Sequence, residues 1–266
     1  MISKIGIIGV GVIGEATKYG MEKLGHQVFA HDIRFDTTID IVKDTDLCFV
    51  CVPTPSKDDL GCDTTVVESV VQELNEMNYE GIIAIKSTIT PSTTKKLQVK
   101  YNNNRICFVP EFLRERCAIA DFTQNHDVCI IGSESTEICN FIKKIHGKYP
   151  NDFVFLSPTE AEFVKYYNNI YNATLITLAN NFYELCIAMD VDYNNVKRAV
   201  VSRDHINDVY MDCNENFRGY GGACLPKDVR AFINLSKSLG LNTGLFEFLD
   251  NENRKYKSTV FEGMRK

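Results

Sequence analysis

The segment Ile5-Gly6-Ile7-Ile8-Gly9-Val10-Gly11-Val12-Ile13-Gly14, near the start of a 266-residue chain, decides the fold. Ile5–Ile8 is a short apolar run that predicts a buried strand. Glycines follow it with the spacing G-x-G-x-x-G, and a helical pattern then runs to about Leu24. Gln27–Asp32 predicts the next strand and ends in an acid. A strand, a glycine turn, a helix and a second strand are the opening unit of a Rossmann-like α/β fold.

This unit predicts a dinucleotide site. Its glycines let a pyrophosphate approach the backbone, and the N-terminus of the following helix attracts the phosphate charge. Asp32 lies 18 residues after Gly14, where a carboxylate binds ribose hydroxyls and repels a 2′-phosphate. We therefore predict NAD rather than NADP as the cofactor, although Arg34 lies close enough to leave NADP open. The predicted cofactor residues of this segment are Gly9, Gly11, Val12, Ile13, Gly14 and Asp32.

Strands and helices continue to alternate through the first half of the chain. The predicted strands are Leu47–Val52, Gly81–Lys86, Ile106–Val109 and Val128–Ile131, and Thr64–Asn78 has helical periodicity. Such alternation predicts a parallel, doubly wound sheet, and we assign residues 1–156 to this predicted NAD-binding domain. Ligands of these sheets collect beyond the carboxyl ends of the strands, where Thr54, Thr88 and Glu111 fall.

The rest of the chain, residues 157–266, predicts an all-α domain built on one long helix from Thr159 to about Met189. Glu162 follows Thr159 at the spacing of a capping box. Lys165 and Asn169 are four apart, and two such donors on one helix face suit an oxygen that develops negative charge. The alternative is a surface lysine beside an ordinary polar residue.

Composition excludes several classes of protein. A formal net charge of −6 without a basic run argues against a nucleic-acid surface. No apolar stretch approaches the ~20 residues of a membrane helix, and no signal peptide is visible. The one Cys-x-x-Cys pair among the ten cysteines, Cys48 and Cys51, lies in a predicted buried strand, so the sequence predicts neither a disulfide framework nor a zinc site. We therefore expect a reducing, cytoplasmic setting and no metal.

The segment Phe217-Arg218-Gly219-Tyr220-Gly221-Gly222-Ala223-Cys224-Leu225-Pro226-Lys227-Asp228 carries the chemistry. A glycine run delivers Cys224 to the start of a predicted helix, with Pro226 in the first turn, where its missing N–H is not needed. The helix N-terminus and Lys227 favour the thiolate of Cys224, and Asp228 is a candidate base toward water. These are the groups needed to form and hydrolyse a thioester. The alternative is a buried cysteine beside a glycine turn.

This last segment resembles the cysteine signature of the UDP-glucose/GDP-mannose 6-dehydrogenase family, Gly-(Phe/Tyr)-Gly-Gly-x-Cys-(Phe/Leu)-Pro-Lys-Asp. Further motifs of the family have counterparts in the same order along most of the chain. They are Val52-Pro53-Thr54-Pro55, Lys86-Ser87-Thr88-Ile89-Thr90-Pro91, Pro110-Glu111-Phe112-Leu113-Arg114-Glu115, and Glu162-Phe163-Val164-Lys165-Tyr166-Tyr167-Asn168-Asn169, with Asn180 on a family asparagine.

The resemblance implies an NAD-linked, two-step oxidation of a nucleotide-sugar C6 alcohol to a carboxylate through a thioester on Cys224, with UDP-glucose as the default substrate. It also implies a homodimer through the long helix. The implied catalytic residues are Cys224, Lys165, Asn169, Asp228, Thr88 and Glu115. Pro53, Thr54, Thr88 and Glu115 are implied in cofactor binding. The implied substrate residues are Glu111, Phe112, Leu113, Arg114, Lys165, Asn169, Tyr220, Gly221 and Lys227.

The sequence also departs from the family. It holds no counterpart of the family's C-terminal nucleotide-binding domain, and His205 stands where relatives have an arginine that reaches the neighbouring subunit's sugar site. Two alternatives therefore stay open: a catalytically impaired regulatory or assembly partner, and a β-hydroxyacid dehydrogenase. A binding module needs none of the catalytic residues, and β-hydroxyacid chemistry needs no cysteine.

Overall fold

The computed structural model describes residues 2–56 and 62–256. The strands are β1 (Lys4–Ile8), β2 (Gln27–His31), β3 (Leu47–Val50), β4 (Ile82–Ile85), β5 (Ile106–Phe108), β6 (Val128–Gly132) and β7 (Asp152–Leu156). The helices are α1 (Val12–Lys23), α2 (Thr65–Glu76), α3 (Thr93–Tyr101), α4 (Ala118–Thr123), α5 (Thr136–His146), α6 (Pro158–Ala188), α7 (Tyr193–Val201), α8 (Leu225–Ser238) and α9 (Gly244–Asn253), with 3-10 turns η1 (Ile39–Val42) and η2 (Glu115–Cys117).

The described residues form two compact units. The first takes the chain up to Thr54 together with Asp63–Lys165, and the second takes the remainder. The division falls inside α6, which is one continuous helix. The predicted domain boundary at 156/157 therefore stays a prediction.

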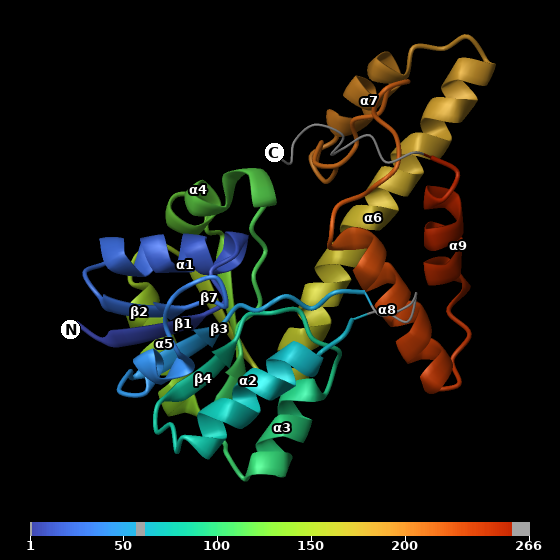
Figure 1. Cartoon of the computed structure of the whole chain (residues 1–266). Helices are drawn as coiled ribbons and strands as arrows, with labels where there is room; N and C mark the ends of the chain where they lie inside the picture. Colours follow the sequence, from blue (N-terminus) through green and yellow to red (C-terminus); the bar gives the residue numbers. More distant parts are fainter. Residues whose placement is uncertain (1, 57–61, 257–266) are drawn as a thin grey trace. The chain divides into compact units, whose positions relative to one another are not determined.

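The first unit contains a sheet with the order β2-β1-β3-β4-β5-β6-β7. The strands from β2 to β5 are parallel, as the sequence predicts; Ile5, for example, pairs with Val28 on one side and Leu47 on the other. Two apolar clusters cover the sheet (Figure 1), one with α1, α4 and α5 and the other with α2, α3 and the start of α6. This confirms the doubly wound α/β fold.

The far edge of the sheet corrects the prediction of a wholly parallel sheet. β6 pairs with β5 antiparallel, and β7, which the sequence pattern does not predict, pairs with β6 in parallel. The register joins Phe108 to Gly132, the last residue of each strand, so β6 meets β5 at its own carboxyl end.

The start of α6 corrects the predicted capping box of Thr159 and Glu162. Ser157 and Glu160 form the reciprocal pair instead: the Ser157 N–H and hydroxyl donate to Glu160 Oε2 at 2.8 and 2.7 Å. Glu162 is buried and accepts from the backbone N–H of Ser92 at 2.5 Å and from the N–H of Thr94 at 2.8 Å. It thereby caps the N-terminus of α3.

The second unit packs α6, α8 and α9 around a core of Tyr166, Ile170, Phe232 and Leu249. The Tyr166 and Phe232 rings lie 4.6 Å apart between centroids. A second cluster joins the later part of α6 to α7 through Cys186 and Tyr193. The described helices include none that is long and apolar enough to cross a bilayer.

Candidate active site

The three glycines after β1 differ in what a side chain would meet at each position. Gly9 has a φ of +88°, and a Cβ there would lie 2.7 Å from the carbonyl oxygen of Cys51. A Cβ on Gly14 would lie 1.9 Å from the Gly9 oxygen, so only glycine lets α1 start this close to β1. At Gly11, no atom of the described residues lies within 4 Å of a Cβ. The turn is therefore open at Gly11 and fits a bound pyrophosphate, with the α1 N-terminus formed by Val12 and Ile13 beside it.

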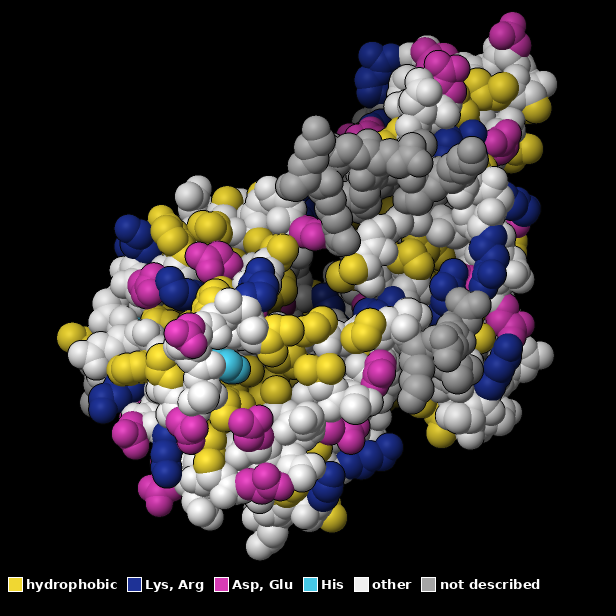
Figure 2. Space-filling model, in the orientation of Figure 1, with side chains coloured by type: hydrophobic (Ala, Val, Ile, Leu, Met, Phe, Trp, Pro, Cys, Tyr) yellow, Lys and Arg dark blue, Asp and Glu magenta, His cyan; other side chains and the backbone are white. Residues whose placement is uncertain are grey.

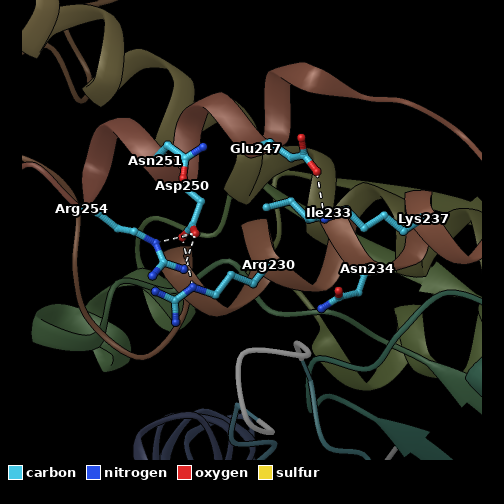
Figure 3. Close-up of a pocket in the computed structure, with 8 residues that line it drawn as sticks. All are labelled: Arg230, Ile233, Asn234, Lys237, Glu247, Asp250, Asn251 and Arg254. Carbon is cyan, nitrogen blue, oxygen red and sulfur yellow. Dashed lines mark hydrogen bonds and ion pairs between the residues drawn. The ribbon is translucent and has the colours of Figure 1, made fainter.

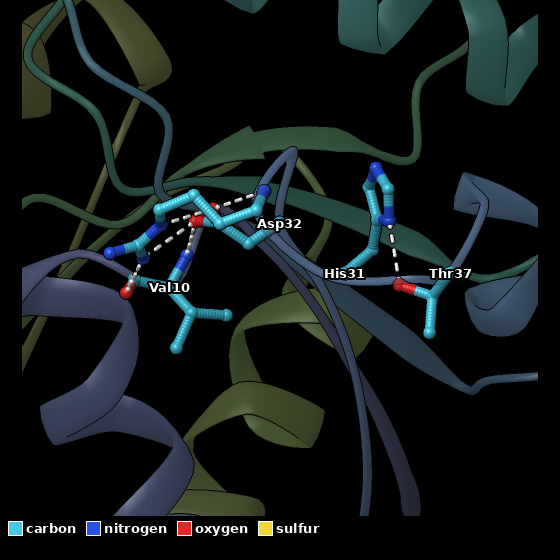
Figure 4. Close-up of polar contacts among 5 residues, drawn as sticks. Val10, His31, Asp32 and Thr37 are labelled. Atoms are coloured by element: carbon cyan, nitrogen blue, oxygen red, sulfur yellow. Dashed lines mark hydrogen bonds and ion pairs between the residues drawn. The ribbon is translucent and has the colours of Figure 1, made fainter.

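Asp32 follows β2 and is held by two neighbours (Figure 4). Its carboxylate accepts from the Val10 N–H at 2.7 Å and from Arg34 Nε at 2.6 Å, while the Arg34 guanidinium also donates to the Val10 carbonyl. The hydrogen bond from Arg34 holds the pKa of Asp32 well below its usual range. Asp32 therefore stays an anion beside the glycine turn, which suits ribose hydroxyls and disfavours a 2′-phosphate.

The other predicted cofactor residues follow the ends of parallel strands of the same sheet. Pro53 and Thr54 come after β3, the half-buried Thr88 comes after β4, and the exposed Glu115 begins η2. The Ser87 hydroxyl donates to the Val52 carbonyl at 2.7 Å and ties the first two turns together. Because the carboxyl ends of parallel strands share one edge, the turns after β1, β3 and β4 meet there.

Glu111 is a buried ion-pair partner, not a member of a solvated acidic turn. Its carboxylate lies 2.8 Å from Lys86 Nζ, and both side chains are almost fully buried. Burial opposes both charges, but their attraction outweighs it, lowering the pKa of Glu111 and raising that of Lys86. The Glu111 carbonyl accepts from Lys165 Nζ at 2.5 Å, and that ammonium lies 5.3 Å from the centre of the Phe112 ring. The ion pair thus fixes the backbone that holds Lys165.

Arg114 pairs with Asp121, a residue that the sequence analysis does not identify. The guanidinium donates to both carboxylate oxygens, at 2.9 and 2.6 Å. The side-chain hydrogen bond from Arg114 keeps the pKa of Asp121 below its usual range. This bidentate pair orders the segment that includes Phe112 and Leu113, and only tertiary contact reveals it.

Cys224 is the N-cap residue of α8, as predicted, and Pro226 lies in the first helical turn. All ten cysteines lie within the described ranges, and among them Cys224 alone is exposed. The Asp228 N–H donates to the Cys224 carbonyl at 2.9 Å, which closes the first turn. The thiol therefore stands at the start of a 14-residue helix, beside backbone N–H groups that have no partner within the helix.

Asp228 lies behind Cys224 and is fully buried. It accepts from Lys227 Nζ at 2.7 Å and from Asn169 Nδ2 at 2.6 Å. Burial opposes the charge on Lys227, but the nearby Asp228 outweighs this and raises the pKa of the ammonium. The structure therefore joins Asn169, Lys227 and Asp228 in one buried network.

Lys165 and Asn169 are one turn apart on α6, as predicted, but each already has its own partner. Lys165 donates to the Glu111 carbonyl, and Asn169 donates to Asp228. Their action on one substrate oxygen stays a prediction.

Tyr220 and Gly221 precede Cys224 in the glycine run. Tyr220 is buried, and its hydroxyl donates to the Leu249 carbonyl at 3.0 Å. Its backbone is held by Asn253, which no sequence motif marks and which the sequence analysis missed.

A pocket of about 390 Å³ lies between α8 and α9. In Figure 3, Arg230 and Arg254 both point at Asp250, and Lys237 pairs with Glu247 at 2.9 Å. The lining contains none of the predicted site residues. Within the described ranges, no cluster of three or more histidine, cysteine or acidic side chains suits a metal ion.

The surface drawn in Figure 2 mixes basic and acidic side chains, with no large region of one sign.

Comparison with known proteins gives the same family in both halves of the chain. Residues 30–149 match the NAD binding domain of the UDP-glucose/GDP-mannose dehydrogenase family, and residues 159–255 match its central domain. The chain is 29% identical to a UDP-glucose 6-dehydrogenase of Pseudomonas aeruginosa over 82% of its own length and 51% of the relative's. It is 27% identical to a GDP-mannose 6-dehydrogenase of Pseudomonas putida, over 91% of this chain and 59% of that protein.

A solved UDP-glucose dehydrogenase from Pyrobaculum islandicum superposes with a TM-score of 0.87 at 25% identity, covering 96% of this chain and 68% of that structure. The chain therefore spans about half to two thirds of the length of these relatives.

Proposed function

Because this chain belongs to the UDP-glucose/GDP-mannose dehydrogenase family, an NAD-dependent family, we propose that it oxidises the C6 alcohol of a nucleotide sugar to a carboxylate. UDP-glucose is the first candidate substrate, since a UDP-glucose 6-dehydrogenase is among the most similar relatives. GDP-mannose follows, because a GDP-mannose 6-dehydrogenase has nearly the same identity to this chain.

The observation that carries the proposal is the state of Cys224. It alone of the ten cysteines is exposed, it begins a helix, and a buried lysine–aspartate pair lies directly behind it. A packing cysteine would be buried, as most of the others are. A β-hydroxyacid dehydrogenase has no use for such a thiol.

In the proposed reaction the C6 alcohol first loses a hydride and a proton to give an aldehyde. The thiolate of Cys224 then bonds to C6, and the aldehyde oxygen takes a proton to give a thiohemiacetal. Loss of a second hydride and proton gives a thioester. Water adds to that carbon, the carbon–sulfur bond breaks, and the carboxylate leaves while the thiolate returns.

Bound NAD would accept the hydride of each oxidation, so one sugar consumes two NAD molecules. Lys165 and Asn169 would hold the reacting oxygen as charge develops on it. Thr88 would order the attacking water, while Glu115 and Asp228 would take up protons. Glu111, Tyr220, Gly221 and Lys227 would position the sugar, together with the segment Phe112–Arg114.

The test is NADH formation at 340 nm with purified protein, NAD and UDP-glucose, UDP-GlcNAc, UDP-GalNAc, UDP-ManNAc or GDP-mannose. We expect two NADH per sugar and loss of turnover in Cys224→Ala. Cys186→Ala, which removes a buried thiol of α6, is the matched control and should retain turnover. Wild-type turnover in Cys224→Ala would refute the thioester step. NAD binding without oxidation of any sugar would refute the activity of this chain.

We further propose that the chain forms a homodimer through α6. Its exposed apolar residues recur at helical spacing; Tyr167 is 77% exposed and Phe182 50% exposed. The stripe comprises Tyr167, Tyr171, Leu178, Phe182 and Leu185. An apolar helix face of this length favours a partner.

Sedimentation velocity of the wild type and of the double variant Tyr171→Glu/Phe182→Glu tests this arrangement. We expect a dimer that dissociates in the variant, whereas Ile33→Glu, at an exposed apolar residue of the first unit, should not change the mass. A monomeric wild type would contradict the proposal.

A further inference from the structure

Two asparagines from different helices form hydrogen bonds to the backbone just before the exposed Cys224. Asn253, at the end of α9, accepts from the Tyr220 N–H at 2.7 Å and donates to the Tyr220 carbonyl at 2.8 Å. Asn180, buried in α6, accepts from the Gly219 N–H at 3.2 Å and from Arg218 Nε at 2.7 Å. The Asn253 amide thus makes both hydrogen bonds to the Tyr220 backbone that a neighbouring β-strand would make.

The packing around this point leaves little freedom. Gly219 has a φ of +63°, and a Cβ there would lie 2.8 Å from Asn253 Oδ1. The Tyr220 ring is buried, and its hydroxyl donates to the Leu249 carbonyl, one turn before Asn253 on α9. Three hydrogen bonds thus fix Tyr220 to a single helix.

The other side of Cys224 is fixed by different side chains. Asp228 accepts from Asn169 Nδ2 at 2.6 Å, and Arg230 pairs with Asp250 at 3.0 Å, so α8 is held by α6 and by α9. Between Tyr220 and Cys224 lie Gly221, Gly222 and Ala223, of which Gly222 has a φ of +76°. Without the anchor at Tyr220, this short glycine-rich link would let the first turn of α8 fray, with loss of the hydrogen bond from the Asp228 N–H to the Cys224 carbonyl.

We propose that Asn253 is a positioning residue that, together with Asn180, holds the Tyr220 backbone so that Cys224 stays at the α8 N-terminus in reach of substrate. The inference rests on the proposed covalent role of Cys224. It assigns Asn253 no contact with substrate: the residue acts only through the loop.

The first readout needs no turnover. Alkylation of Cys224 by iodoacetamide is followed at pH 7 by mass spectrometry of its peptide in wild type, Asn253→Ala and Asn253→Asp. Asn251→Ala is the control, since Asn251 is an exposed asparagine on the same helix. Both Asn253 variants should react at least threefold more slowly, because the sulfur spends less time beside the free N–H groups of α8. Asn253→Asp keeps the shape of the side chain, but it turns an oxygen without a proton toward the Tyr220 carbonyl.

The second readout separates positioning from general destabilisation. In the NADH assay kcat should fall about tenfold in Asn253→Ala, with KM for NAD and the melting temperature close to those of Asn251→Ala. The effects of Asn253→Ala and Asn180→Ala on alkylation should not add, because both act on one loop. An alkylation rate for both Asn253 variants within twofold of the control would overturn the inference. Because alkylation is measured without a sugar, an absence of turnover in the wild type would refute the proposed function without deciding this inference.

Discussion

Gly11→Ala should weaken NAD binding strongly without unfolding the protein. Among the residues that the structure describes, nothing lies within 4 Å of a Cβ at Gly11, and its φ of −81° suits alanine. Alanine restricts the unfolded chain, which stabilises by about 0.4–1 kcal/mol. The N-cap position prefers glycine to alanine by a similar amount, about 0.5–1 kcal/mol, so the two effects nearly cancel. Since 1 kcal/mol shifts Tm by about 2–4 °C in a protein of this size, Tm should change by less than ~3 °C.

The same methyl group would occupy the space that a pyrophosphate needs. Losing two charge-assisted hydrogen bonds, each worth about 1.5–3 kcal/mol, weakens binding by about 3–6 kcal/mol. At about 1.4 kcal/mol per factor of ten, Kd for NAD should rise roughly 10²- to 10⁴-fold. Isothermal titration calorimetry measures this directly.

Alanine substitutions at two further glycines are the controls for Gly11→Ala. Gly244→Ala makes the same change at another open position, the first residue of α9, and should leave both Tm and NAD affinity unchanged. Gly14→Ala should lower Tm by more than ~5 °C, because its Cβ would lie 1.9 Å from the Gly9 oxygen. If Gly11→Ala binds NAD as tightly as the wild type, the pyrophosphate does not rest on this turn and the reasoning fails.

Three further predictions concern buried or paired charges. Burial lowers the pKa of His146 to about 3, so between this pH and the unfolded pKa of about 6.5 only the unfolded chain binds the proton. The unfolding free energy should therefore fall by about 2 kcal/mol between pH 6.5 and pH 5. Urea titrations at the two pH values should show a smaller fall in His146→Leu. Glu111→Gln leaves Lys86 charged and buried without its partner, so the unfolding free energy in urea should drop by about 3–5 kcal/mol, and the double change with Lys86→Met should recover part of it. Asp32→Asn should weaken NAD binding about 10- to 100-fold by calorimetry, because the variant loses an anionic acceptor for ribose hydroxyls. NADP binding should weaken less, because the variant no longer repels a 2′-phosphate. Equal losses for both cofactors would contradict this role.

Local signals predicted the parts of the fold and site that lie within one or two elements. The apolar run Ile5–Ile8, the glycine spacing after it and the acid after β2 predicted a strand, a tight turn, a helix and a second strand, which the structure confirms. Pro226 and the glycine run placed Cys224 at a helix start, and the structure agrees. Each of these depends on φ, on helix termini or on the period of buried residues, all of which are written in neighbouring positions.

Pairs between distant positions could not be predicted in this way. Glu162 fits a capping box by spacing, yet it caps α3, 68 residues away at Thr94. Asp228 meets Asn169 across 59 positions, and Asn253 meets Tyr220 across 33. No periodic pattern links such residues, because their contact depends on how whole elements pack.

The sequence by itself therefore determined most of the elements, the glycine turn after β1 and the helix terminus that carries Cys224. Only the tertiary structure decided the antiparallel edge at β6, the partners of the buried charges and the anchoring of the loop by Asn253. The physical reason is that backbone conformation responds to neighbouring residues, whereas a buried polar group must find whichever partner the packing of distant elements brings within hydrogen-bond distance.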